Sequence, residues 1–204
     1  MKLQLALPTL LFGLSIIGCQ HSEPEAQSAH ESTPTEKDYW IQELNKQIDK
    51  FEGGDSIAID GLPLSEFPDE FYDNTHIRFL WISCTEPGCM AKLSSKIAQL
   101  TKLETLILSK TSLSRLPREI GQLTELKELR VLAGGDLTEI PEEVGNLKQL
   151  EILDLWRNQL EDLPASIYQL ENLKTLYIGE NNFSTSQIRE IKRKLPTVDV
   201  KTDR

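Results

Sequence analysis

The sequence predicts an α/β solenoid, a curved parallel sheet made of about six stacked copies of one short unit. An apolar frame, LxxLxLxx with a further apolar residue beyond it, occurs six times between Ile57 and Ile178. Its LxL part alternates with the two-residue period of a β-strand. A second part begins in three copies with Pro117, Pro141 and Pro164, at steps of 24 and 23 residues. Because proline has no backbone N–H, this part cannot lie in a central strand. Each copy is therefore predicted to contain a strand, a turn and a return segment.

The copies are most regular in the middle of the chain. Regular copies begin at Leu103, Leu126 and Leu150, a short copy begins at Leu173, and two looser copies precede them in residues 57–97. One copy alone cannot bury its leucines, so neighbouring copies must stack, with strands about 4.8 Å apart.

The segments "LPREIGQL" and "IPEEVGNL" resemble the leucine-rich repeat family, in the variety that carries LPxxIGxL, over about residues 56–200. The resemblance implies a leucine-rich repeat solenoid. It also implies an asparagine at the ninth position of each repeat, where the amide bonds backbone groups of the turn. Asn158 and Asn181 fit this pattern, whereas Thr111 replaces the asparagine in one repeat and a Gly134–Gly135 pair replaces it in another.

An amphipathic helix is predicted in residues 38–54, before the first repeat. Trp40, Leu44, Ile48 and Phe51 follow helical spacing, and two glycines end the segment. The open end of a solenoid exposes core leucines, so we interpret this segment as an N-terminal capping helix. A helix that binds a partner is the alternative.

The other end of the repeats is predicted to be a helix followed by a last strand. Ile188, Ile191 and Leu195 supply the apolar side of the helix, which Pro196 ends, and residues 198–200 form the strand. The basic residues 192–194 suit a helix C-terminus electrostatically, which we prefer to a nucleic-acid patch.

The N-terminus has the features of a bacterial lipoprotein signal peptide in residues 1–18. An apolar run of about 15 residues, too short to span a membrane, ends in "IIGC". This tetrapeptide resembles a bacterial lipobox, which implies cleavage before Cys19 and lipidation of that cysteine. An ordinary signal peptide is the alternative. Because Gln20 rather than Asp follows, the resemblance favours the outer membrane over the inner membrane of the cell envelope.

Residues 19–37 are predicted to be a disordered tether because they contain no large apolar residue. The repeat domain then occupies residues 55–204. The chain carries 22 Lys and Arg against 32 Asp and Glu, a net charge of −10. Such an acidic protein is a poor partner for nucleic acid or anionic lipid, so membrane contact is expected through the lipid anchor only. We expect a monomer.

Cys84 and Cys89 lie in "CTEPGC", where the repeat is three residues longer than usual. In an oxidising compartment such a loop can close as a disulfide, which we prefer to two inert thiols or to metal or redox chemistry. His21, His30 and His76 do not have zinc-site spacing. We expect neither a metal nor a cofactor.

No catalytic motif is present, so the sequence does not predict an enzyme. It lacks a Gly-rich phosphate loop, GxSxG and HExxH. Acidic residues such as Asp69, Glu70 and Asp73 are interpreted as a solvated surface.

The predicted functional surface is the inner side of the curved sheet, called the open face below. Strand alternation directs large apolar, aromatic and charged residues onto it. Trp, Tyr and Arg are enriched at binding hot spots, which favours recognition of a protein. The predicted partner-binding residues are Phe79, Trp81, Ile107, Arg130, Leu132, Ile152, Asp154, Trp156, Arg157 and Tyr177.

Three alternatives to this interpretation remain open. The helix or the cysteine loop could cover Phe79 and Trp81, and an extra residue could turn Leu132 inward. The face could bind a glycan, although Ile107 and Ile152 offer no polar group to a sugar. The domain could also be a structural spacer that binds nothing.

Overall fold

The computed structural model describes residues 38, 42, 46, 54–61, 67–84, 89–132, 134 and 136–203. The chain divides into two units, residues 1–33 and 34–204, and all described residues belong to the second. The signal peptide, Cys19 and the tether lie outside the described residues. So do the apolar residues of the predicted capping helix, of which Asp38, Gln42 and Lys46 alone are described, as helical and exposed. A cap at this end stays a prediction.

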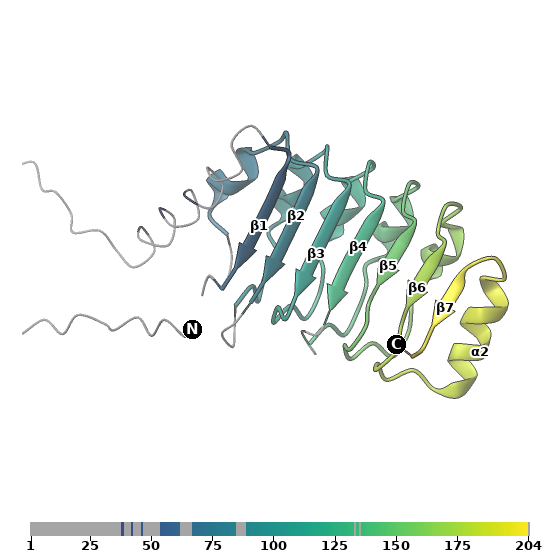
Figure 1. Ribbon diagram of the computed structural model, residues 1–204. Helices are drawn as coiled ribbons and strands as arrows, with labels where there is room; N and C mark the ends of the chain where they lie inside the picture. Colours follow the sequence, from purple (N-terminus) through teal and green to yellow (C-terminus); the bar gives the residue numbers. More distant parts are fainter. Residues whose placement is uncertain are drawn as a thin grey trace, which may run out of the picture. The chain divides into compact units, whose positions relative to one another are not determined.

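Seven parallel strands form one sheet in which spatial order follows chain order (Figure 1). Each strand pairs in register with the next, so that Trp81 lies beside Ile107 and Ile107 beside Arg130. The strands are β1 (Ser56–Asp60), β2 (Phe79–Ser83), β3 (Thr105–Ser109), β4 (Glu128–Leu132), β5 (Ile152–Asp154), β6 (Thr175–Tyr177) and β7 (Asp199–Lys201). The predicted solenoid is confirmed.

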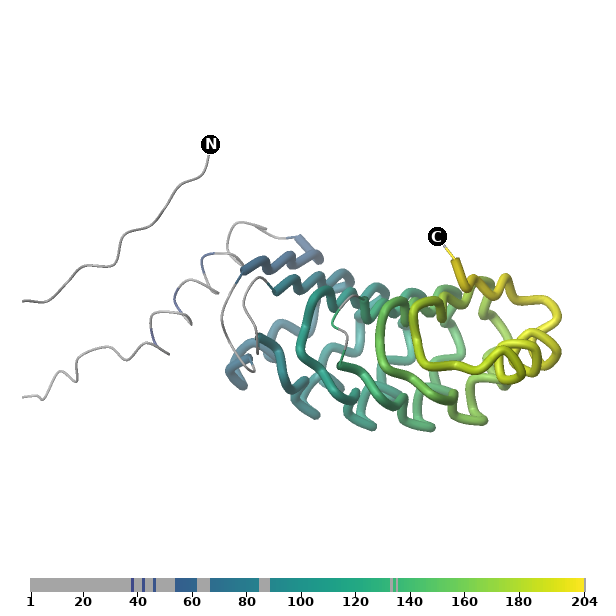
Figure 2. Tube along the Cα trace, turned by 90° about the horizontal axis from the view of Figure 1, so that it is seen from below, coloured from purple at the N-terminus to yellow at the C-terminus, as the bar shows by residue number. Residues whose placement is uncertain are grey.

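The return segments form a row of short 3₁₀ helices on the opposite side of each coil from the sheet (Figure 2). Pro117, Pro141 and Pro164 each take an extended conformation directly before one of them, where a missing N–H removes no bond. The helices are η1 (Asp69–Asp73), η2 (Ser95–Gln99), η3 (Arg118–Gln122), η4 (Glu142–Asn146) and η5 (Ala165–Gln169).

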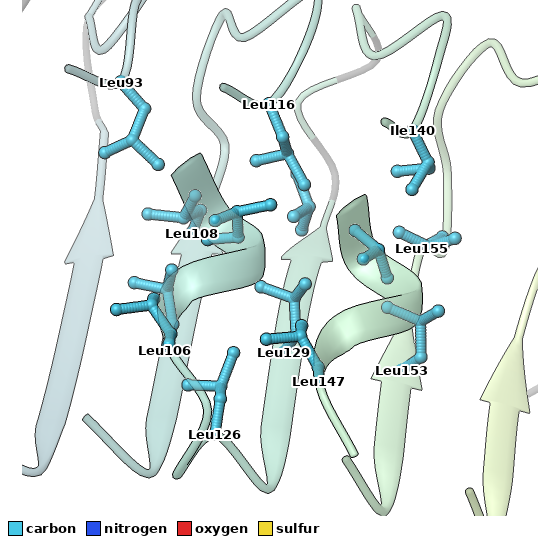
Figure 3. Close-up of a cluster of buried hydrophobic side chains, with 14 of the residues drawn as sticks. Leu93, Leu106, Leu108, Leu116, Leu126, Leu129, Ile140, Leu147, Leu153 and Leu155 are labelled. Carbon is cyan, nitrogen blue, oxygen red and sulfur yellow. The ribbon is translucent and has the colours of Figure 1, made fainter. Parts of the chain in front are cut away.

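The core lies between the sheet and the row of 3₁₀ helices (Figure 3). Strand leucines such as Leu106 and Leu129 meet Leu126 and Leu147, which follow the 3₁₀ helices, and all four are fully buried. Apolar residues from neighbouring coils therefore form one continuous core, as the repeated frame predicts.

The glycine of LPxxIGxL allows adjacent 3₁₀ helices to stack closely. A Cβ at Gly121 would lie 2.4 Å from the carbonyl oxygen of Glu143, and one at Gly145 would lie 2.4 Å from the Cβ of Ser166. The last copy has Tyr168 instead, and the Nζ of Lys194 from helix α2 (Thr185–Lys194) lies 4.6 Å from the centre of its ring. The glycine is also absent from η1 and η2, which have Tyr72 and Ala98 at this position.

Asparagine side chains bond the backbone of successive turns, as the family resemblance implies. The Nδ2 of Asn158 donates to the carbonyls of Val131 at 2.8 Å and Leu155 at 3.0 Å. Asn181 repeats this pattern one coil later, donating to Leu155 and Ile178. Thr111 cannot reproduce it, and its buried hydroxyl has no hydrogen-bond partner among the described residues.

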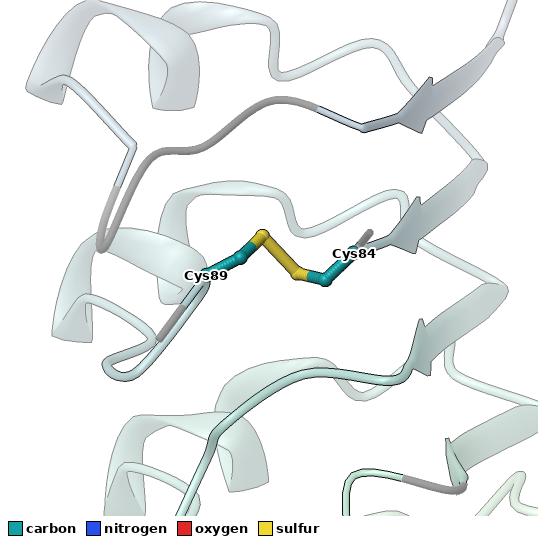
Figure 4. Close-up of a disulfide and its surroundings, with 2 residues drawn as sticks. All are labelled: Cys84 and Cys89. Atoms are coloured by element: carbon teal, nitrogen blue, oxygen red, sulfur yellow. A yellow bond between two sulfur atoms is a disulfide. The ribbon is translucent and has the colours of Figure 1, made fainter. Parts of the chain in front are cut away.

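A disulfide joins Cys84 and Cys89, with the two Cα atoms 5.8 Å apart (Figure 4). Both cysteines are buried. The Cys84 N–H donates to the Ser109 carbonyl, and the Cys89 carbonyl accepts from the Ser112 N–H. The bond therefore closes the longer turn after β2 while both ends stay hydrogen-bonded to the next coil.

Helix α2 and β7 end the repeats as predicted. The Ser184 hydroxyl accepts the Gln187 N–H and the Gln187 side chain accepts the Ser184 N–H, forming a capping box. Ile191, Leu195 and Val200 close the core. Arg193 and Lys194 pair with Glu190 within the helix.

Charges alternate along the stack at the position just before each of the strands β1 to β6. The Arg78 side chain pairs with Asp55 and Glu104, Lys127 Nζ lies 2.7 Å from Glu104, and Lys174 Nζ lies 2.7 Å from Glu151. Each coil thus meets an opposite charge on a neighbour. The six residues, in stacking order, are Asp55, Arg78, Glu104, Lys127, Glu151 and Lys174.

Candidate interaction surface

The open face is the side of the sheet away from the 3₁₀ helices, and register aligns its residues in rows across the strands. The middle row runs from Ala58 on β1 to Lys201 on β7. Its members are Ala58, Trp81, Ile107, Arg130, Asp154, Tyr177 and Lys201. Alternate residues of the same strands, such as Leu80 and Leu106, are fully buried on the other side.

Trp81 is the most accessible apolar side chain on this face. It is 37% exposed and is the one exposed large hydrophobic residue in the described part of the chain. Ala58 and Ile107 flank it in register, and Phe79 lies two residues earlier on the same strand, half-buried. This geometry argues against complete coverage of Trp81 by the described residues.

The centre of the face carries an arginine held by two carboxylates. Arg130 Nε donates to Glu128 on the same strand, and its Nη1 lies 3.5 Å from Asp154 Oδ2 on the next strand. Asp154 also accepts the Trp156 N–H at 3.1 Å. These contacts hold the guanidinium in place. The side chain of Arg130 is still 31% exposed.

The structure corrects one predicted contact. The side chain of Asp154 has no exposed surface, because neighbouring residues cover it. A partner cannot touch it directly. Its carboxylate instead positions Arg130, which pairs with it across the strands.

Trp156 lies against the backbone of the next coil at Gly179. A Cβ at Gly179 would lie 2.2 Å from Cζ3 of Trp156 and 2.6 Å from the Thr202 carbonyl oxygen. Gly179 therefore leaves the space that the indole occupies. Trp156 is half-buried, as are Ile152, Leu132 and Tyr177. Leu132 aligns with Ser109 on the open face, so the extra residue of its repeat does not turn it inward.

Arg157 lies beyond the sheet, in the turn after β5. Its backbone is left-handed, with φ of 61°, and its Nε lies 3.2 Å from Glu180 in the next turn. The structure thus places Arg157 at the edge of the open face rather than within it.

Lys201 and Asp203, which were not among the predicted site residues, complete the C-terminal part of the open face. Arg130, Tyr177, Lys201 and Asp203 surround a hollow. Lys201 Nζ lies 2.8 Å from Asp199, and this hydrogen bond is the main reason why the pKa of Lys201 lies above its usual value. The predicted last strand carried the signal, because alternation around Val200 directs Asp199 and Lys201 outward.

The described residues provide no group of three or more His, Cys, Asp or Glu arranged to hold a metal. Within the same part of the chain, no helix has the length and apolar character to cross a membrane.

The stacked strands, the asparagine-bonded turns and the shared leucine core together define a leucine-rich repeat solenoid. Residues 131–196 match the family model described as a leucine-rich repeat region. No curated protein matches the chain.

Several solved structures have a similar fold. A leucine-rich repeat protein of Leptospira interrogans is 30% identical, with a TM-score of 0.61, over 70% of this chain and 36% of its own. The leucine-rich repeat domain of the type III effector XopL is 28% identical, with a TM-score of 0.67, over 85% of this chain and 60% of its own. This chain therefore spans less than two thirds of either structure.

A third similar structure is an octameric complex of latrophilin 3, Unc5D and the leucine-rich repeats of FLRT2. The similarity is 25% identity with a TM-score of 0.55, over 72% of this chain and 44% of the other. Leucine-rich repeats thus occur there in a complex with other proteins.

Proposed function

We propose that this chain is a lipid-anchored envelope protein that binds a protein partner through the open face of its repeats. The observation that carries the proposal is the exposed Trp81 ring, aligned with Ile107 and next to Phe79 on a sheet face without a covering layer of described residues. A large aromatic side chain with apolar neighbours favours a hot spot for protein recognition.

The proposed contact surface includes every predicted partner-binding residue except Asp154, which positions Arg130. Protein binding is a common role of leucine-rich repeats, and the complex that contains FLRT2 is an example. The proposed contacts are Phe79, Trp81, Ile107, Arg130, Leu132, Ile152, Trp156, Arg157 and Tyr177.

Two features support export to the envelope. The "IIGC" sequence ends an apolar run of signal-peptide length. The Cys84–Cys89 disulfide suits an oxidising compartment, because reducing conditions in a bacterial cytosol disfavour structural disulfides. We propose Cys19 as the lipidation site and the outer membrane as the location.

Affinity capture of cross-linked envelope proteins tests the binding face. The full chain is compared with Trp81→Ala/Ile107→Ser and with a control, Gln122→Ala/Asn146→Ala, whose changes lie on exposed positions of η3 and η4. We expect one or more proteins to be captured by wild type and control and to be lost from the Trp81 variant. Identical captured proteins in all three would contradict binding through this face, and the absence of any captured protein would favour a structural spacer. Capture of envelope glycans alone would favour glycan binding.

A further inference from the structure

The open face is divided into a nearly neutral half and a charged half. Across β1 to β3, the outward positions carry one charge, Asp60. From β4 onward, two cations accompany four carboxylates. The cations are Arg130 and Lys201, and the carboxylates are Glu128, Asp154, Asp199 and Asp203. Apolar contact and charge are therefore separated along the stack.

The existing ion pairs leave the charged half negative. Arg130 is shared between Glu128 and Asp154, and Lys201 is paired with Asp199. Both cations are thus matched by carboxylates already present. Because Arg130 has two carboxylate partners, one negative charge is left unbalanced beside it. The exposed carboxylate of Asp203 adds a second negative charge at the hollow.

The hollow beside Tyr177 lies in this charged half, where four carboxylates accompany two cations. Tyr177 lines it together with Arg130, Lys201 and Asp203. A phenol ring attracts a cation over its face, and a carboxylate at the rim supplies a charge-assisted hydrogen bond. The net charge of −10 on the whole chain would also speed the approach of a basic partner.

From these observations, and resting on the proposed function, we infer that the partner is a basic protein segment that crosses the strands. Its apolar residue contacts Trp81 and Ile107, and its lysine or arginine enters the hollow at Tyr177 and Asp203. Four strand steps of about 4.8 Å separate β2 from β6, about 19 Å in all. About six residues of extended chain, or about thirteen of helix, span this distance.

Selection from a random peptide library displayed on phage, with the full chain as bait, tests the inference. Peptides that also bind Trp81→Ala/Ile107→Ser are removed, so that the retained peptides depend on the apolar half. They are then measured against Asp203→Lys and a control, Asp73→Lys, which makes the same charge change on η1. We expect peptides with a net positive charge that lose at least tenfold in affinity with Asp203→Lys and keep it with Asp73→Lys.

The two proposals fail in different ways. Retained peptides that are neutral or acidic, or that bind Asp203→Lys as well as wild type, would overturn the basic partner and leave the proposed face intact. If no peptide depends on Trp81 and Ile107, both the face and the partner class are wrong.

Discussion

At the scale of single residues, several positions of the repeats have separate physical roles. Asn158 places its amide among buried carbonyls and donates hydrogen bonds to two of them. Gly179 leaves space for an indole, and Gly121 leaves space for a neighbouring backbone. Each role depends on a neighbour from the next or previous coil. A residue in one repeat is therefore best understood from the repeat beside it.

We predict that Asn158→Ala destabilises the fold by about 2 kcal/mol. The change leaves the carbonyls of Val131 and Leu155 buried without their amide donor. Urea unfolding measures the loss as a lower midpoint at constant slope. The control is Asn182→Ala, since Asn182 is exposed and its amide makes one bond of 3.4 Å, to Gln159. Equal stabilities of both variants would contradict a structural role for the buried amide.

At the scale of elements, a disulfide within one coil and ion pairs between coils add to the contacts of the leucine core. The disulfide closes the turn after β2, the strand that carries Trp81 and Phe79. The alternating charges link the coils at the other end of the strands. Both kinds of contact thus act on the ends of the strands that form the open face.

We predict that Cys84→Ser/Cys89→Ser lowers the free energy of unfolding by about 2 kcal/mol, the loop-entropy value for so short a closure. The matched comparison uses a reductant during denaturant unfolding. It should lower the midpoint of the wild type and leave that of the double variant unchanged. If complete reduction left the unfolding midpoint of the wild type unchanged, the disulfide would add no stability.

Glu104 makes the charge alternation sensitive to acid. Its pKa lies below the usual value of 4.5, chiefly because Lys127 donates a hydrogen bond to its carboxylate, with Arg78 adding to the effect. A lowered pKa in the folded protein means that the contribution is complete above about pH 4.5. It is lost as the pH falls through the folded-state pKa.

We therefore predict that Glu104→Gln has a lower melting temperature than wild type at pH 7 and that this difference shrinks below pH 4. Thermal unfolding between pH 3 and pH 7 measures it, with 0.5 M salt reducing the difference at neutral pH. The control is Glu70→Gln, on an exposed position of η1. A difference that is independent of pH would assign the effect to packing instead of charge.

At the scale of the whole molecule, the proposed anchor and the proposed binding face are separate parts of one chain. Acyl chains contribute about 0.8 kcal/mol per buried methylene, so several chains on Cys19 would hold the protein stably at a bilayer. The repeats would then be free to meet a partner in the envelope. Because anchoring and partner binding would use different residues, we expect a substitution to abolish one without affecting the other.

We predict that Cys19→Ser abolishes incorporation of labelled fatty acid and releases the protein from the membrane fraction. Partner capture should persist, because the open face lies entirely within residues 56–203. Fractionation and labelling of wild type and Cys19→Ser measure both effects, with Trp81→Ala as a variant that should stay lipidated. Labelled fatty acid on Cys19→Ser would exclude this cysteine as the anchor.

The fold could be predicted in detail because the same apolar pattern recurs in successive repeats and predicts the same geometry each time. Leu106, Leu129 and Leu153 recur at the strand position and are fully buried. Pro117 and Pro141 recur before the return segments and precede 3₁₀ helices. The final helix and strand followed from apolar spacing and from Pro196. Strand alternation also placed the open-face residues on one side of the sheet.

The sequence by itself determined the solenoid, the order of its strands and which side chains face outward, because these follow from local periodicity and from the need to bury each repeat against the next. Only the tertiary structure decided how far each outward residue is accessible. Asp154 is buried and Trp81 is exposed although both lie in the same row, because accessibility depends on the length and direction of side chains from neighbouring coils. Those neighbours are 20 or more residues away in the sequence.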